Sequence, residues 1–159
     1  MWQSGQSIVL RAPTGAGKTW TVVAPFLHAL SNNARFADRL IYALPLRSLA
    51  SGIHRSVLDS LSRIPESFPT IESSAKSRSY SDPTLHCSLQ MGGEKNDPFF
   101  ESDLVFTTID QLLSGYLSLP VSLPKRLGSM VAGALIGSAI VIDEAHLQFH
   151  DAKAPVAAD

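Results

Sequence analysis

The chain has 159 residues, and its formal net charge at pH 7 is −1. This length suits one domain with a substantial core, and the near-neutral charge excludes a strongly basic protein that binds nucleic acid by charge alone. Hydrophobic residues make up 45% of the sequence, in runs far shorter than the ~18 residues of a membrane span. The single cysteine excludes an internal disulfide framework. We expect a cytoplasmic protein without a signal peptide or a membrane partner.

Residues 12–19 read Ala-Pro-Thr-Gly-Ala-Gly-Lys-Thr. The apolar run Ile8-Val9-Leu10 predicts a strand at 7–11 before them, and residues 18–30 predict a helix after them, which Pro25 kinks or ends early. Strand, glycine-rich turn, Gly-Lys-Thr and helix are the layout of a phosphate-binding P-loop. The glycines let backbone N–H groups converge on an anion, and the helix start adds its positive dipole end. An accidental Gly-Lys-Thr in a surface turn is the alternative, and the flanking pattern argues against it.

The P-loop predicts ATP and Mg²⁺ as cofactors. Lys18 would reach the β- and γ-phosphates, and the Thr19 hydroxyl would ligate Mg²⁺. The residues expected to bind the nucleotide are Pro13, Thr14, Gly15, Ala16, Gly17, Lys18 and Thr19.

Residues 39–44 form a near-continuous apolar run, which predicts a strand buried on both faces of a parallel sheet. Pro45 ends it, and a helix is predicted from about Arg47 to about residue 63. A basic and a hydroxyl side chain at a helix start, beside a strand's carboxyl end, are well placed to hold a phosphate of a bound strand. The alternative is that Arg47 only solvates the helix start. The helix has one apolar stripe, made by Leu49, Ile53, Val57 and Leu61.

Residues 65–83 contain three prolines and several serines and predict a long loop at 67–81, either a mobile insertion or a loop that faces nucleic acid. A short strand is predicted at 86–89, and Gly92 and Gly93 follow it. A pair of glycines frees backbone N–H groups for close approach to a ligand, and a plain tight turn is the alternative.

Residues 103–107 predict a strand that turns into a helix, which Thr108 or Asp110 can cap. Residues 118–137 predict a connector with a short helix at about 127–135.

Residues 139–142 predict the last strand, which delivers Asp143-Glu144-Ala145-His146 at its carboxyl end. An apolar strand followed by an acidic pair is the Walker B arrangement. Asp143 would hold the Mg²⁺ that bridges the phosphates, and Glu144 would orient and deprotonate the attacking water. The alternative is an acidic helix start after a strand. The sequence therefore predicts that Lys18 and Asp143 meet across one magnesium-nucleotide pocket at neighbouring strand tips.

Two other pairs have the composition of metal ligands. His86 and Cys87 are adjacent on a predicted strand, so their side chains point to opposite faces. His150 and Asp151 lack the additional His and Asp ligands that a metal nuclease requires. We interpret neither pair as a metal site.

Four stretches, in this order, resemble the first RecA-like lobe of a superfamily 2 helicase: residues 12–19, 45–50, 107–113 and 141–146. Ala12 stands where the standard P-loop has glycine, and Ala-Pro-Thr-Gly is similar to the first motif of that group. Three further stretches resemble the CRISPR-associated type I helicase-nuclease: Ala-Leu-Pro-Leu-Arg-Ser-Leu-Ala, Thr-Ile-Asp-Gln-Leu-Leu and Leu-Pro-Val-Ser-Leu-Pro-Lys-Arg-Leu. The implied fold is α/β, a RecA-like P-loop NTPase with a mostly parallel sheet flanked by helices.

The resemblance also implies roles for individual residues. His146 would couple the ATP site to neighbouring motifs, and Gln3 and Gln6 are weak candidates for an adenine contact. The implied contacts to the backbone of single-stranded nucleic acid are Pro45 and Arg47 in motif Ia, Gly92 and Gly93 in a glycine turn, and Thr107 and Thr108 in motif Ib. The implied activity is ATP-driven 3′ to 5′ translocation on single-stranded DNA, coupled to an HD nuclease domain and an RNA-guided CRISPR complex.

Residues 1–159 end before the Ser-Ala-Thr motif III of such a lobe, and we expect the second lobe and the HD nuclease domain to be absent from this chain. The arginine fingers of the second lobe would then be missing, and such an arginine contributes on the order of 10³- to 10⁵-fold in rate. We therefore expect an incomplete first lobe that is weakly active alone. Two alternatives stay open: a P-loop NTPase that does not act on nucleic acid, and an inactive remnant.

Overall fold

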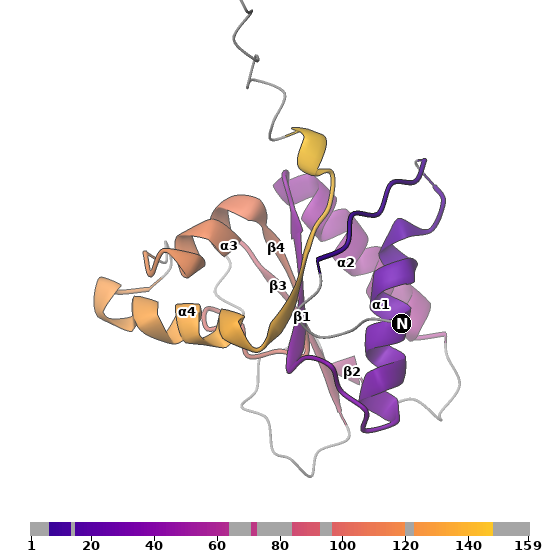
Figure 1. Cartoon of the computed structure of the whole chain (residues 1–159), viewed down its shortest axis with the longest axis horizontal. Helices are drawn as coiled ribbons and strands as arrows, with labels where there is room; N and C mark the ends of the chain where they lie inside the picture. Colours follow the sequence, from indigo (N-terminus) through magenta and orange to yellow (C-terminus); the bar gives the residue numbers. More distant parts are fainter. Residues whose placement is uncertain are drawn as a thin grey trace, which may run out of the picture.

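The computed structural model describes residues 7–13, 15–63, 71–72, 84–92, 97–119 and 123–147. Within these residues, four parallel strands form the main sheet in the order β3-β4-β1-β5 (Figure 1). A two-residue strand, β2 (Ile71–Glu72), pairs in parallel with β3. The main strands are β1 (Arg39–Leu44), β3 (Leu85–Gln90), β4 (Leu104–Thr108) and β5 (Ser138–Ile142). The predicted α/β fold with a mostly parallel sheet is confirmed.

Helices cover both faces of this sheet (Figure 1). α1 (Lys18–Ser31) and α2 (Arg47–Leu61) pack on one face, whereas α3 (Ile109–Tyr116) and α4 (Gly128–Ile136) pack on the other. Side chains alternate along β1 accordingly, because successive strand residues point to opposite faces. Leu40, Tyr42 and Leu44 join the core under α1 and α2, and Ile41 and Ala43 join the core under α3 and α4.

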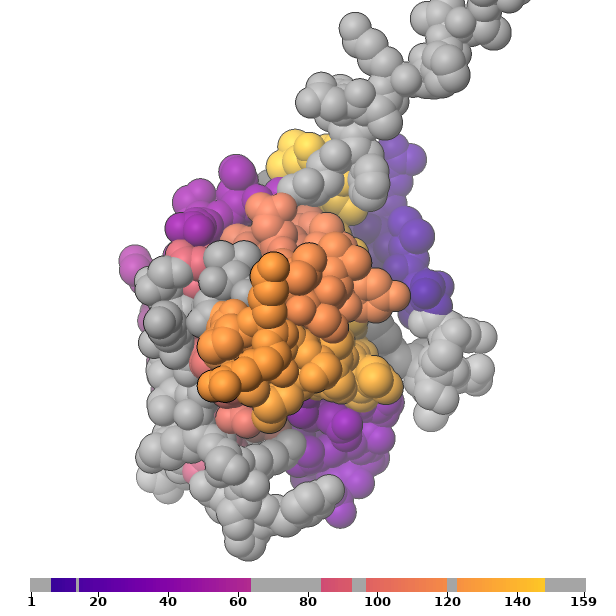
Figure 2. Space-filling view, turned by 90° about the vertical axis from the view of Figure 1, so that its left-hand side faces the viewer, coloured from indigo at the N-terminus to yellow at the C-terminus, as the bar shows by residue number. Residues whose placement is uncertain are grey.

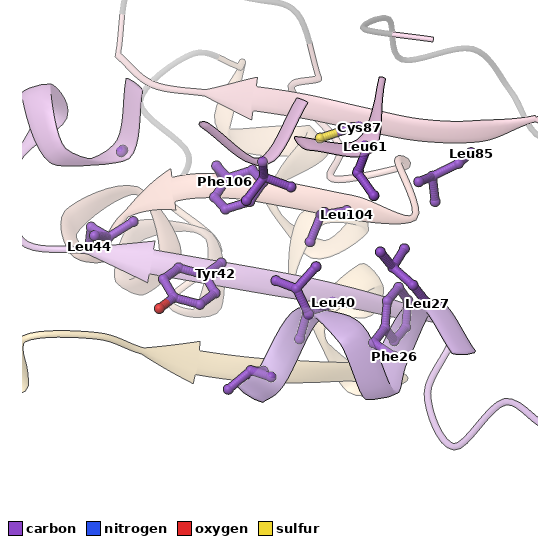
Figure 3. Close-up of a cluster of buried hydrophobic side chains, with 14 of the residues drawn as sticks. Phe26, Leu27, Leu40, Tyr42, Leu44, Leu61, Leu85, Cys87, Leu104 and Phe106 are labelled. Atoms are coloured by element: carbon purple, nitrogen blue, oxygen red, sulfur yellow. The ribbon is translucent and has the colours of Figure 1, made fainter. Parts of the chain in front are cut away.

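Figure 3 shows the core under α1 and α2, to which α1 contributes Phe26 and Leu27. The opposite side of the molecule, formed by α3 and α4, faces the viewer in Figure 2. No helix in the described part of the chain combines the length and the apolar character that crossing a membrane requires.

The strand register brings the carboxyl ends of the main strands to one edge of the sheet. Leu44 lies opposite Thr108, and Ala43 lies opposite Ile142. The segments that follow β1, β3, β4 and β5 therefore start at the same edge. This is the edge where ligands bind in open parallel sheets.

The prediction of a strand at 7–11 is wrong. These residues have no regular structure, and Ile8, Val9 and Leu10 are 59%, 95% and 49% exposed. β5 is the edge strand on this side, and a cavity of about 740 Å³ is lined both by β5 and by Ser7, Ile8 and Leu10. Residues 7–10 face β5 across this cavity instead of pairing with it, so they form no strand and their side chains stay exposed.

Smaller corrections concern the helices and the long loop. α1 continues past Pro25 to Ser31, because Phe26 and Leu27 after the proline are buried in the core. α2 ends at Leu61, and its buried stripe contains Ala50 in place of Leu49, which is exposed. Part of the predicted loop at 67–81 forms β2.

Asp97 connects the segment that precedes β4 with strand β3 through hydrogen bonds. Its buried carboxylate accepts hydrogen bonds from the Ser88 hydroxyl (2.8 Å) and from the backbone N–H groups of Glu101 (2.7 Å) and Ser102 (3.0 Å). Its own N–H donates to the side-chain oxygen of Gln90 (3.1 Å). The carboxylate is therefore the common acceptor for three donors inside the fold.

We expect Asp97→Ala to lower the free energy of unfolding by about 3 kcal/mol, because it leaves these donors without an acceptor. Urea denaturation of the chain measures this. Asp59→Ala, at an exposed position on α2, is the matched control and should change stability by less than about 0.5 kcal/mol. Equal stabilities of the two variants would contradict the role of Asp97.

Candidate active site

The P-loop has the backbone of an anion-binding turn. Gly15 and Gly17 have φ values of +80° and +78°, in the left-handed region that glycine adopts without strain. The Ala16 N–H donates to the Pro13 carbonyl at 3.3 Å and closes the turn. α1 begins at Lys18 with neither a side-chain cap nor an acidic residue in its first turn. The first-turn N–H groups thus carry no competing carboxylate, as a helix start that binds an anion requires.

The acidic box, residues 143–146 after β5, contacts the P-loop through an ion pair. The Lys18 Nζ lies 3.3 Å from the Glu144 Oε1, although the two residues are 126 positions apart. The His146 Nδ1 lies 3.4 Å from the other carboxylate oxygen of Glu144. Glu144 has a φ of +50°, which is uncommon for a residue other than glycine. Lys18 and Glu144 neutralise each other here, and an arriving phosphate would compete with Glu144 for Lys18.

Tyr42 connects the remaining two residues of the site. Its hydroxyl donates to the Asp143 Oδ2 at 2.7 Å, and its oxygen lies 3.4 Å from the Thr19 Oγ1. Lys18 and Asp143 line the same cavity. The structure thus brings together Lys18, Thr19, Asp143 and Glu144, as the sequence predicted. Tyr42 was not predicted, although a tyrosine in a buried strand signals a hydrogen-bond partner for its hydroxyl.

The Thr19 hydroxyl and the Asp143 carboxylate fit a magnesium site. Both offer hard oxygen ligands, and both lie within reach of the same phenol oxygen. Mg²⁺ uses one or two carboxylates together with phosphate oxygens and waters, so it needs no larger set of protein ligands. Among the described residues, no group of three or more His, Cys, Asp and Glu side chains is arranged for a metal.

A second cluster lies at the same edge of the sheet, where α2, α3 and the turn after β3 meet. The Arg47 Nη2 lies 2.7 Å from the position that a Cβ atom on Gly92 would occupy, and the Gln111 Nε2 lies 3.5 Å from it. Arg47 is exposed, and Pro45 is half-buried. Arg47 and Gly92 are therefore brought together, and Gln111 joins them without having been predicted.

Thr107 and Thr108 both use their side-chain oxygens in hydrogen bonds inside the fold. Thr107 is fully buried, and its hydroxyl donates to the Gln90 carbonyl at 2.8 Å across the β3–β4 pair. This corrects the expectation that Thr107 contacts nucleic acid, because its side chain has no exposed surface. Thr108 is also buried, and its oxygen accepts from the Gln111 N–H at 3.4 Å as the cap of α3. The predicted capping role of Thr108 is confirmed.

Some candidate residues lie outside the described residues. They are Thr14 of the P-loop, Gly93 of the glycine pair, Gln3, Gln6, His150 and Asp151.

The sequence model of the DEAD/DEAH box helicases matches residues 1–158. The chain belongs to the DEAD/DEAH box helicase family. This helicase domain is also 32% identical, over 148 residues, to the CRISPR-associated helicase Cas3 of Thermoproteus tenax. The alignment covers 88% of this chain and 24% of that protein, so the chain spans about a quarter of its relative's length. No solved structure matches the chain.

Membership of the DEAD/DEAH family supports a RecA-like fold and a helicase-type ATPase domain that binds ATP. The P-loop, the acidic box and the parallel sheet are the parts of this chain that agree with it.

Cys87 lies in the core of the helicase domain, beneath α1 and α2. Burial, with a smaller contribution from the negative charge of Asp103, raises the pKa of the Cys87 thiol to about 12. An exposed cysteine has a pKa near 8.5, and the thiolate is the reactive form. The folded domain should therefore keep Cys87 protonated and unreactive at pH 8.5.

We expect a chromogenic disulfide reagent at pH 8.5 to label the folded chain at least about 100-fold more slowly than the chain in 6 M guanidinium chloride. The cysteine is single, so the unfolded chain supplies the control for the same thiol. Rapid labelling without denaturant would contradict the burial of Cys87.

Proposed function

We propose that this domain is the ATP-binding and ATP-hydrolysing lobe of an ATP-dependent helicase or translocase that acts on single-stranded DNA. The observation that carries the proposal is the meeting of Lys18 with Glu144, beside Thr19 and Asp143, at one edge of a parallel sheet. Two segments more than 100 residues apart thus supply a phosphate-binding cation, a hydroxyl and two carboxylates to one place.

Each residue of this site has a role in the proposed reaction. The P-loop N–H groups would hold the phosphates, and Lys18 would leave Glu144 to bind the β- and γ-phosphates. Thr19 and Asp143 would hold Mg²⁺, which neutralises phosphate charge when bound. Glu144, released from Lys18, would orient and deprotonate the attacking water. His146 contacts Glu144 and would relay the state of the site to neighbouring motifs.

The proposed nucleic-acid contacts are Arg47, Gly92 and the neighbouring backbone at Pro45, because Thr108 is buried as the cap of α3. Arg47 is an exposed cation at a helix start, and it packs against Gly92. A guanidinium in this position can bind a phosphate without reading the base sequence. The relative from Thermoproteus tenax is named as a CRISPR-associated helicase, which supports a role in CRISPR interference. The partners that we propose from the sequence resemblance are an RNA-guided complex and a separate nuclease domain. A second RecA-like lobe would complete the ATP site.

The ATP site is tested with two variants of the chain. Lys18→Ala should weaken Mg-ATP binding by about 10-fold or more, because it removes a charge-assisted contact to phosphate. Glu144→Gln should keep the binding and, in the complete protein with its second lobe, reduce hydrolysis by about 100-fold or more, because it removes the general base. Binding is measured from the rise in melting temperature with Mg-ATP, and hydrolysis from phosphate release.

Lys125→Ala, at an exposed lysine before α4, is the control and should behave like the wild type. No stabilisation of the wild-type chain by Mg-ATP would favour an inactive remnant.

The nucleic-acid contact is tested in the complete protein with Arg47→Ala. We expect single-stranded DNA binding to weaken by about 10-fold, with the slope of its salt dependence reduced by about 1, while ATP affinity stays the same. Fluorescence anisotropy of a labelled strand at several salt concentrations measures both. Arg55→Ala, also exposed on α2, is the matched control. Unchanged DNA binding in Arg47→Ala would favour an NTPase that does not act on nucleic acid.

A further inference from the structure

Tyr42 lies in the middle of β1 and reaches from the core into the ATP site. Its side chain is 1% exposed, and its ring packs against that of Phe106 with 5.7 Å between the centroids. Figure 3 shows the ring among the core side chains, with its oxygen turned toward the carboxyl ends of the strands. The ring is thus part of the core, and only the hydroxyl reaches the polar residues of the site.

The hydroxyl provides one of two hydrogen bonds that hold the Asp143 carboxylate in place. One carboxylate oxygen accepts from Tyr42 at 2.7 Å, and the other accepts from the backbone N–H of Glu144 at 2.8 Å. The Asp143 N–H in turn donates to the Ala43 carbonyl at 2.9 Å, so the backbone is also held. A carboxylate with a donor on each oxygen cannot rotate without breaking a hydrogen bond.

The hydroxyl is not needed for packing on this face of β1. Leu40 and Leu44 show that an apolar residue can fill this face of β1, so the core itself does not need a hydroxyl here.

We infer that Tyr42 is a positioning residue of the ATP site, whose hydroxyl sets the orientation in which Asp143 binds Mg²⁺ next to Thr19. This inference rests on the proposed function, which makes Thr19 and Asp143 the magnesium ligands. Groups that orient a ligand by hydrogen bonding typically change metal affinity by about 10- to 100-fold when they are removed. A hydroxyl that served the core alone would have no influence on the magnesium requirement.

The test is Tyr42→Phe in the 159-residue chain, which keeps the ring and removes only the oxygen. Binding of a fluorescent ATP analogue is titrated with Mg²⁺ and, separately, measured in EDTA. We expect the Mg²⁺ concentration at half-maximal binding to rise by about 10-fold, with binding in EDTA unchanged. A Mn²⁺ titration followed by electron paramagnetic resonance reads the metal directly and should show the same shift. Tyr116→Phe, at an exposed position on α3, is the control for the same chemical change.

The ratio of magnesium-dependent to magnesium-independent binding does not depend on how much of the variant is folded. A ratio equal to that of the wild type would overturn the role of Tyr42, whether total binding is kept or reduced. Failure of the wild-type chain to bind the analogue under any condition would instead overturn the proposed function, and this inference with it.

Discussion

The parallel pairing of β1 with β5 is the contact on which the candidate site depends. Its register places Tyr42 opposite Val141, and the hydrogen bond from the Asp143 N–H to the Ala43 carbonyl extends the pairing past the end of β5. A slip of one residue would turn Tyr42 to the other face of the sheet and separate it from Asp143. The packing of α1 on the face that carries Tyr42 then brings Lys18 and Thr19 to the same place.

The ion pair between Lys18 and Glu144 matters more for chemistry than for stability. Both side chains are about one quarter exposed, and ion pairs in such positions contribute about 1 kcal/mol or less. The ion pair with Glu144 holds the Lys18 ammonium beside the P-loop. A bound phosphate could replace Glu144 as the partner of Lys18. Glu144 is also held in a left-handed backbone conformation, and uncommon backbone conformations are concentrated at functional sites.

β1 joins the two clusters at the carboxyl edge of the sheet. Tyr42 contacts the acidic box, and five residues later Arg47 begins α2 beside Gly92. The two clusters are thus joined by a short stretch of chain, which supports the proposal that ATP and a nucleic-acid strand act on one lobe. The cavity between β5 and residues 7–10 is also lined by Lys18, Tyr42 and Asp143, so it belongs to the candidate site. In the described part of the chain, the outer edge of β5 has no strand beside it.

The sequence by itself determined the P-loop, the acidic box and the parallel α/β fold, because these depend on residue types at fixed local spacing. Only the tertiary structure decided three other features: residues 7–11 form no strand, Thr107 is buried, and Tyr42 contacts Asp143. Residues 7–11 have the composition of a strand, but a strand forms only beside a partner. Whether the Thr107 hydroxyl faces solvent depends on its pairing with β3. Tyr42 and Asp143 are 101 positions apart, and only the sheet register brings the phenol to the carboxylate.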